Sequence, residues 1–484
     1  MLFNSIEFLI FFVFIVLFYF SISAKHRWAL LLIASYYFYM CWKPEYILLI
    51  LGSTLIDYFC GIKMGQKNTK KARKPFLFLS LFTNLGLLFA FKYFNFFSDS
   101  VRILFNYTNI FYNVPYFNAL LPVGISFYTF QTLSYSIDVY RGNKKTEKHL
   151  GIFALYVAFF PQLVAGPIER STRLLPQLKK ENNFNYKRIK EGVLLMLWGF
   201  FKKIVIADRL AVVVNTVYND VGSYQGYPLL IASIFFAFQI YCDFSAYSDI
   251  AIGGAKVMGY DLMRNFNRPY FSKSISEFWR RWHISLGSWF KDYVYIPLGG
   301  SRVSTFRKYL NIIIVFLVSG LWHGANWTFI IWGALHGFYQ IIGFILNPIK
   351  NKIINLFKFN KTNTYYKFIQ VLITFVLVDF AWIFFRSNSL KDSIYIIKNI
   401  FIFSTDIKSI HSLGLDEKDI HLSILLILFL LIIQLKQRKI SIINWVLNQN
   451  IIVRWIFYYI FIFTIIILGF YGSSDESQFI YFQF

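Results

Sequence analysis

Long apolar runs separated by short polar loops dominate the chain. Residues 4–23 contain a single charge, Glu7, and residues 420–433 and 455–471 are similarly apolar. A bilayer span needs about 20 mostly apolar residues. The pattern therefore predicts an all-α, polytopic membrane protein with about 11–13 transmembrane or re-entrant helices. The predicted spans lie near residues 5–23, 28–42, 45–64, 75–96, 117–140, 191–213, 227–254, 309–321, 325–347, 366–385, 420–434 and 452–471.

The loops between the first five predicted spans alternate in charge. Residues 25–27, 67–74 and 141–148 are basic, whereas 43–45 are neutral overall and 97–116 carry only Asp99 and Arg102. Because basic loops stay in the cytoplasm, this alternation predicts an N-terminus outside. The first apolar run lacks a basic start and a small-residue cleavage site, so we interpret it as a retained anchor.

Two stretches depart from this pattern of full spans. Residues 152–165 are only 14 long, are broken by Pro161 and have basic residues on both sides, which favours a re-entrant element. Irregular backbone at membrane depth needs shielding by protein or by a water-filled cavity, so a tunnel is expected here. Residues 261–308 are too polar to span and predict amphipathic helices at the cytoplasmic interface within a single domain over 1–484.

Composition excludes several other classes of protein. Hydrophobic residues make up 57% of the 484 and charged residues 15%, whereas a soluble domain carries about 25% charged residues. The net charge of +25 comes from cations in short loops, which membrane insertion explains without nucleic acid. Cys41, Cys60 and Cys242 are isolated in apolar segments, so neither a disulfide framework nor a metal site is expected, and all three are interpreted as buried apolar residues.

Candidate chemistry is confined to polar residues in apolar surroundings, which are costly there and are functional suspects. Hydrolase, phosphate-loop and zinc-protease motifs are absent. His323 lies between Gly320 and Gly324, where a buried imidazole can accept a proton near neutral pH. If the segment is helical, Asn326 can orient the ring or a substrate carbonyl. Spacing alone does not decide between this role and a hydrogen-bonded packing histidine.

Two further histidines occupy aromatic-rich segments. His336 lies thirteen residues after His323, so on one helix the two would point in different directions. The spacing of Trp279, Trp282 and His283 favours an amphipathic helix anchored at the membrane surface, with Arg280 and Arg281 facing elsewhere.

Two carboxylates, Asp243 and Asp249, lie six residues apart in an apolar context. They point about 120° apart on a helix, so a catalytic pair is disfavoured. A network fixing Arg or His partners is the better interpretation.

Seven segments occur in an order that resembles the membrane-bound O-acyltransferases, specifically the alginate O-acetyltransferase branch. They are LPVGISFYTFQ (121–131), FPQLVAGPI (160–168), YCDFSAYSD (241–249), FWRRWHISL (278–286), YIPLGG (295–300), LWHGA (321–325) and FIYFQF (479–484). The resemblance implies a many-helix bacterial plasma-membrane fold enclosing a tunnel, with a cytoplasmic acyl-CoA donor such as acetyl-CoA and no metal. It gives His323 the catalytic role and His283 a second functional role.

The resemblance also implies a relay. In this branch the acyl group passes to an extracytoplasmic partner acyltransferase that decorates a polysaccharide. Trp322, Asn326, Arg280, Arg281 and Asp243 are candidates for binding substrate or cofactor. The acceptor stays open among alginate, peptidoglycan and another exopolysaccharide, because the Lys-, Ile-, Asn- and Phe-rich composition is typical of AT-rich coding. Teichoic-acid-type D-alanyl transfer and a non-enzymatic glycan transporter are the alternatives.

Overall fold

The computed structural model describes residues 1–108, 112, 114–117, 121–164, 166–356, 363–402, 413–471 and 479–480. Its contacts divide the chain into two compact units, which are described separately. The first unit consists of residues 1–196 and 247–263, and the second of residues 197–246 and 264–484. Helix α12 (Tyr227–Met258) contributes its N-terminal part to the second unit and its C-terminal part to the first.

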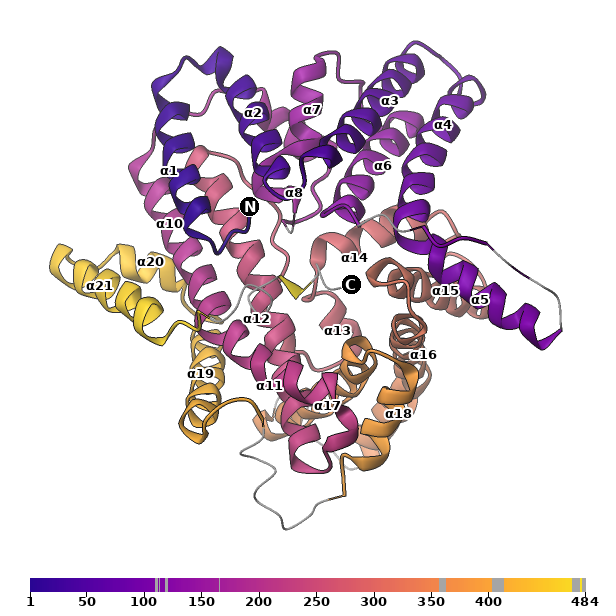
Figure 1. Ribbon diagram of the computed structural model, residues 1–484, viewed down its shortest axis with the longest axis vertical. Helices are drawn as coiled ribbons and strands as arrows, with labels where there is room; N and C mark the ends of the chain where they lie inside the picture. Colours follow the sequence, from indigo (N-terminus) through magenta and orange to yellow (C-terminus); the bar gives the residue numbers. More distant parts are fainter. Residues whose placement is uncertain are drawn as a thin grey trace. The chain divides into compact units, whose positions relative to one another are not determined.

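The first unit is a set of packed helices. In Figure 1, α3 (Ile47–Gly65), α4 (Lys70–Leu88) and α6 (Ile125–Arg141) lie side by side, and they contact one another. Helix α2 (Arg27–Met40) packs on α7 (Leu150–Ala158). The remaining elements are α1 (Ile6–Ser21), η1 (Ala24–His26), η2 (Pro44–Tyr46), the π-helical turn η3 (Phe89–Tyr93), α5 (Phe94–Tyr107), α8 (Phe160–Leu163), α9 (Ser171–Leu178) and α10 (Tyr186–Phe200), whose last residues belong to the second unit.

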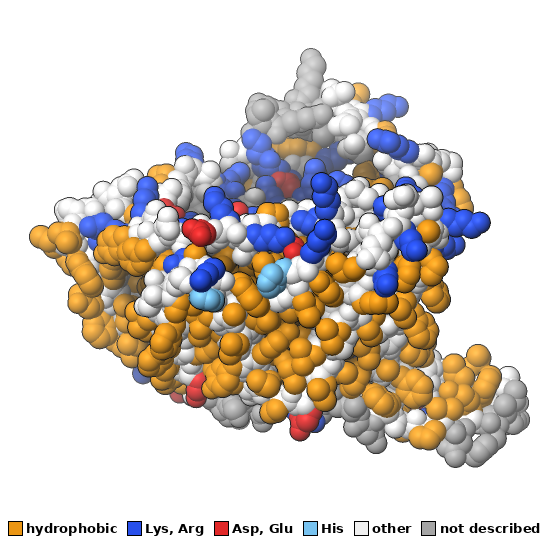
Figure 2. Space-filling model, turned by 90° about the horizontal axis from the view of Figure 1, so that it is seen from above, with side chains coloured by type: hydrophobic (Ala, Val, Ile, Leu, Met, Phe, Trp, Pro, Cys, Tyr) orange, Lys and Arg blue, Asp and Glu red, His pale blue; other side chains and the backbone are white. Residues whose placement is uncertain are grey.

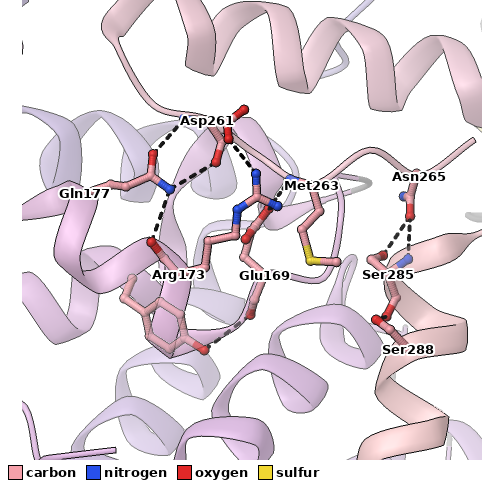
Figure 3. A network of polar contacts seen from close by, with 9 residues as sticks. Glu169, Arg173, Gln177, Asp261, Met263, Asn265, Ser285 and Ser288 are labelled. Atoms are coloured by element: carbon pink, nitrogen blue, oxygen red, sulfur yellow. Dashed lines mark hydrogen bonds and ion pairs between the residues drawn. The ribbon is translucent and has the colours of Figure 1, made fainter.

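Polar contacts fasten α9 to the segment that follows α12 (Figure 3). Arg173 Nη2 lies 2.6 Å from Asp261 Oδ2, and Gln177 Oε1 accepts a 2.7 Å hydrogen bond from the Asp261 N–H. Glu169 accepts a hydrogen bond from the Met263 N–H. Burial raises the pKa of Glu169 to about 7, although the Met263 N–H and Arg173 favour its ionised form. This network fixes the end of α12 within the first unit.

The second unit contains several long apolar helices. Helix α15 (Thr305–His323) packs along α16 (Trp327–Leu356), which contacts α17 (Thr364–Arg386). Two short helices, α13 (Ile275–Trp279) and α14 (Ile284–Phe290), precede them. The other elements are the π-helical turn η4 (Phe201–Ala207), α11 (Asp208–Asn219), η5 (Val221–Ser223), η6 (Pro269–Phe271), the π-helical turn η7 (Lys291–Tyr295), α18 (Leu390–Asn399), α19 (Glu417–Lys436), α20 (Ile442–Leu447) and α21 (Ile451–Leu468).

The predicted all-α, polytopic membrane fold is confirmed. Within the described ranges, eight helices are long and apolar enough to cross a bilayer: Pro44–Gly65, Lys70–Tyr107, Tyr227–Met258, Thr305–His323, Trp327–Lys352, Thr364–Arg386, Glu417–Lys436 and Ile451–Leu468. Figure 2 shows a broad hydrophobic surface with Lys and Arg side chains gathered along one margin. A surface of this kind would aggregate in water and suits contact with lipid.

Several local expectations need correction. The span expected at 75–96 is part of one 38-residue helical run, Lys70–Tyr107, that continues through a π-helical turn. The span expected at 191–213 is part of the continuous helical run of α10, η4 and α11. This run contains several buried charged side chains, so it is not one of the eight helices apolar enough to cross a bilayer. Cys41 is exposed, whereas Cys60 and Cys242 are buried as expected. The predicted break near Pro161 is present, between α7 and α8.

Two glycines allow α15 and α16 to approach closely. A Cβ at Gly320 would overlap the carbonyl oxygen of Phe329, and a Cβ at Gly333 would overlap that of Phe316. Small residues at such crossings let helix backbones touch inside membranes. The backbones of the two helices are therefore in direct contact at the last turn of α15.

Replacing Gly320 by alanine is expected to lower thermal stability, because the added methyl group forces α15 and α16 apart. Overpacking of this kind costs about 1–3 kcal/mol. Gly343→Ala in α16 is the matched control, since a Cβ there meets no atom within 4 Å. Thermal denaturation of the detergent-solubilised proteins measures the difference, and equal midpoints for the two variants would contradict the close packing.

Candidate active site

The end of α15 holds His323 in an aromatic pocket. His323 is the last residue of α15, and Gly324 then turns the chain into an extended conformation. The His323 ring is buried, with its centroid 5.0 Å from that of Trp332 and 5.2 Å from that of Phe385. Gly324 is required here because a Cβ would overlap the Phe329 ring.

Trp322 connects the two histidines that the sequence analysis singled out. Its ring centroid lies 4.9 Å from that of His323 and 6.0 Å from that of His283. All three residues belong to the second unit and are buried. The structure therefore brings His323, His283 and Trp322 into one neighbourhood, although 40 positions separate the histidines in the chain (323 − 283).

An unusual backbone conformation positions His283. Its φ of 41° and ψ of 56° fall in the left-handed region, which is costly for a residue with a side chain. Asn265 holds this geometry in place: its carbonyl accepts from the Ile284 N–H at 2.9 Å. Its Oδ1 accepts from the Ser285 N–H at 3.2 Å and from Ser285 Oγ at 2.7 Å (Figure 3). The Asn267 N–H also donates to the Arg281 carbonyl, 2.9 Å away.

The expected amphipathic surface helix is therefore wrong. The chain leaves α13 after Trp279 and starts α14 at Ile284, so Trp282 and His283 do not share a helical stripe with Trp279. Both side chains are only 1% exposed, which also excludes the surface-anchoring interpretation for them. A period-3.6 pattern cannot reveal a left-handed residue that depends on a partner twenty positions away.

The His283 ring lies among aromatic rings. Its centroid is 4.6 Å from that of Phe244, and the planes of the two rings are nearly perpendicular. Burial lowers the pKa of His283 to about 3. The imidazole is therefore neutral at physiological pH, with one donor and one acceptor nitrogen.

Asp243 is part of a buried charge cluster in the second unit. Lys203 Nζ lies 2.9 Å from Asp243 Oδ1 and 2.7 Å from Asp208 Oδ1. The Ile480 N–H donates to Asp243 Oδ2 at 2.7 Å, which ties the C-terminal segment to α12. The expected partner was Arg or His, and the structure has Lys instead. These contacts occupy both carboxylate oxygens in a structural network, so they do not support the predicted substrate-binding role of Asp243.

Other candidate residues have local roles. The helix that would have aimed Asn326 at His323 ends before it. Asn326 Oδ1 accepts from the Thr328 N–H at 3.0 Å, and its Nδ2 donates to the Asn388 carbonyl. Arg281 forms an ion pair with Glu277 and donates to the Arg268 carbonyl. Arg280 is exposed, and its Nε donates to the Ser276 carbonyl.

His336 was misread from the sequence. It lies on α16, and the break at Gly324 separates α16 from α15, so the single-helix argument does not apply. The Trp332 centroid lies 5.0 Å from His323 and 5.1 Å from His336. Trp279 Nε1 donates to His336 Nδ1 at 3.3 Å. Gly324 was the signal in the sequence that could have revealed this. If Gly324 is taken as the end of a helix, His323 and His336 fall on two successive helices.

Tryptophan rings complete the enclosure. Trp332 and Trp382 stack with centroids 5.7 Å apart, and Trp282 lies 5.1 Å from Trp382. Within the described part of the chain, no group of three or more His, Cys, Asp or Glu side chains is arranged to hold a metal ion. The site therefore combines the buried His323 and His283 rings with walls of aromatic side chains, a setting that can support proton transfer.

Comparison with known proteins decides the family. Residues 149–385 match the membrane-bound O-acyltransferase family. A probable alginate O-acetylase of Pseudomonas aeruginosa is 41% identical over 411 residues, which cover 84% of this chain and 76% of that protein. The chain belongs to the membrane-bound O-acyltransferase family. The predicted resemblance is therefore confirmed, and this family member is a multi-pass membrane protein and an acyltransferase.

Two further relatives carry different names. A peptidoglycan O-acetyltransferase of Helicobacter pylori is 36% identical over 396 residues, covering 76% of this chain and 73% of that protein. A teichoic acid D-alanyltransferase of Streptococcus thermophilus is 30% identical over 292 residues, covering 56% and 69%. Since the family is one of enzymes, the alternative of a non-enzymatic glycan transporter is wrong.

The buried, neutral His283 predicts a pH dependence of stability in this O-acyltransferase. Its pKa is about 3 in the folded protein and 6.5 when unperturbed, so the unfolded state binds the extra proton first as the pH falls. The stabilisation by neutral His283 is complete above pH 6.5 and is lost progressively below it. Between pH 7.5 and 5, the melting temperature of wild type should fall more steeply than that of His283→Gln.

His421→Gln serves as the control, because His421 is exposed on α19. This variant should keep the wild-type slope. Parallel curves for wild type and His283→Gln would show that His283 titrates normally and is not held neutral by burial.

Proposed function

We propose that this O-acyltransferase takes an acetyl group from acetyl-CoA on the cytoplasmic side and exports it for O-acetylation of a cell-surface polysaccharide. The relatives named for O-acetyl transfer support this, at 41% and 36% identity over 84% and 76% of the chain. The relative named for D-alanyl transfer is 30% identical over 56%. The acetyl donor is therefore favoured over an aminoacyl donor.

One observation carries the assignment of roles to residues. The Trp322 ring contacts both His323 and His283, so a group bound against Trp322 lies within reach of two imidazoles. Buried histidines that share an aromatic wall and lie away from solvent are suited to acid–base work on a reaction that competing water would spoil.

In the proposed reaction His323 is the general base. Its ring nitrogen removes the proton from an acceptor hydroxyl while the hydroxyl oxygen attacks the thioester carbonyl carbon. The carbon–sulfur bond breaks, and the proton passes from His323 to the departing sulfur, which leaves as the CoA thiol. Neutral His283 donates a hydrogen bond to the carbonyl oxygen as negative charge develops there. In an alternative order, His323 first attacks the thioester and carries the acyl group itself.

The donor's phosphates need cationic partners on the cytoplasmic side. Arg281 is engaged by Glu277, whereas Arg280 and Lys291 are exposed near the ends of α13 and α14. Arg280, one of the predicted candidates, and the nearby Lys291 are therefore the preferred phosphate contacts.

The acceptor lies outside the plasma membrane in this proposal, and the N-terminus lies on that same side. An extracytoplasmic partner acyltransferase receives the group and places it on the polysaccharide. Alginate and peptidoglycan are both supported by the names of relatives, and another exopolysaccharide fits the same chemistry.

Replacing either histidine distinguishes a catalytic role of His323 and His283 from a role in packing alone. His323→Ala should lower acetyl-CoA-dependent thiol release by the purified protein about 10²–10⁴-fold, because loss of a general base costs that much. His283→Ala should lower the rate without changing the amount of inserted protein. His421→Ala, on the exposed face of α19, should stay within about twofold of wild type.

Thermal denaturation of each variant shows whether it is folded. A folded His323→Ala variant that keeps the wild-type rate of thiol release, and of polysaccharide O-acetylation in cells, would exclude His323 as the base.

A further inference from the structure

The first unit contains a cavity of about 280 Å³ that the acyl-transfer chemistry does not use. Five segments converge on it: the end of α1, η1 with the start of α2, the start of α7, the end of α9, and Tyr260 after α12. Its walls include Tyr19, Arg27, Trp28 and Asn182. It lies beside the 25–27 loop, which the charge pattern predicts to be cytoplasmic.

Cations dominate the lining of this cavity. The lining includes one carboxylate, Glu181, and four cations: Lys25, Arg27, Lys179 and Lys180. Lys179 is already paired with Glu147, its Nζ 2.6 Å from Oε2. Within the described residues neither Lys25 nor Lys180 forms an ion pair, so both ammonium groups are available to an anion.

Arg27 is held in position at the cavity wall. Its Nη1 donates to the Asn182 carbonyl at 2.6 Å, its Nε donates to the Ile22 carbonyl, and its guanidinium lies 4.8 Å from the Tyr19 ring centroid. Tyr19 and Tyr260 hydroxyls lie 3.1 Å apart behind it. A fixed guanidinium backed by two tyrosines is a pre-organised partner for a phosphate group.

The cavity lies beside an exposed apolar surface. Helix α1 exposes an apolar stripe that ends next to the cavity residue Tyr19: Ile10, Val13, Phe14, Leu17 and Phe18. Exposed Phe184, two residues after Asn182, packs against Phe20 of the same helix, with ring centroids 5.4 Å apart. A ligand held here has a cationic site for its polar end and an apolar surface for a hydrocarbon chain.

Size favours a headgroup over a whole nucleotide cofactor. Pockets for drug-sized ligands measure about 300–1,000 Å³, so this cavity is at the small end of that range. We propose that it binds the headgroup phosphate of an anionic phospholipid of the cytoplasmic leaflet, with Lys25, Arg27 and Lys180 around the phosphate. Acyl chains then follow the apolar stripe of α1. This inference does not rest on the proposed acetyl transfer.

Lipid titration of the full-length protein tests this site. The protein is purified in a neutral detergent and its melting temperature is followed as phosphatidylglycerol or phosphatidylcholine is added to the micelles. Phosphatidylglycerol should raise the melting temperature of wild type, and phosphatidylcholine should not. In Lys25→Gln/Lys180→Gln, about 10- to 30-fold more phosphatidylglycerol should be needed, because each cation near an anionic headgroup contributes about tenfold or less.

Lys70→Gln/Lys71→Gln is the matched control. These two exposed lysines lie at the start of α4, in another basic segment, and the double substitution removes the same charge. It should respond to phosphatidylglycerol like wild type. Equal responses of the two double variants would overturn the site. Displacement of phosphatidylglycerol by equal concentrations of inorganic phosphate or CoA would overturn the lipid assignment.

Discussion

The contact between α15 and α16 at Gly320 and Gly333 determines the geometry of the candidate active site. Because both positions lack a Cβ, the two helices approach closely along the last turn of α15. That turn presents Trp322 and His323 side by side, and the first turns of α16 supply Trp332, whose ring contacts His323, and Phe329, whose ring lies against Gly324. The catalytic candidate is thus held by packed helix surfaces instead of a surface loop.

The second histidine depends on a different constraint, which is polar and not steric. Asn265 accepts hydrogen bonds from the N–H groups of the two residues that follow His283, Ile284 and Ser285. These bonds stabilise the left-handed conformation of His283 at the start of α14. Strained backbone of this kind persists only where its surroundings over-determine it, and it concentrates at functional sites. Trp322 then links the two independently positioned rings.

Buried charge in the second unit is balanced locally. Lys203 lies between Asp208 and Asp243, and neighbouring Lys202 donates to Ser245 Oγ at 2.6 Å. The C-terminal Ile480 N–H satisfies the remaining oxygen of Asp243, while Phe479 packs against Phe244, which also touches His283. Buried ions without such partners would be strongly destabilising at this depth. Residues more than 230 positions apart therefore support the same wall of the site.

The sequence predicted the helical membrane fold well, because apolar runs of bilayer length report burial in lipid directly. Ordered motifs singled out His323, His283 and Trp322, which the structure brings together, whereas spacing left His323 undecided. Their roles in the reaction stay predictions. The surroundings of His283 could not be predicted, since Asn265 acts across twenty residues and breaks an apparent helical stripe. Asn326 and His336 were misinterpreted for one reason: both arguments assumed a helix through Gly324. The tunnel, the orientation in the membrane and the partner protein remain predictions.

The central claim is that both histidines face one acyl group bound against Trp322. A cryo-electron microscopy structure in lipid nanodiscs with a non-hydrolysable thioether analogue of acetyl-CoA tests it most directly. We expect density for the acetyl end in contact with Trp322, with its carbonyl oxygen within hydrogen-bonding distance of His283 and its carbonyl carbon next to His323. An analogue whose acetyl end binds elsewhere, while both imidazoles contact only protein, would contradict it.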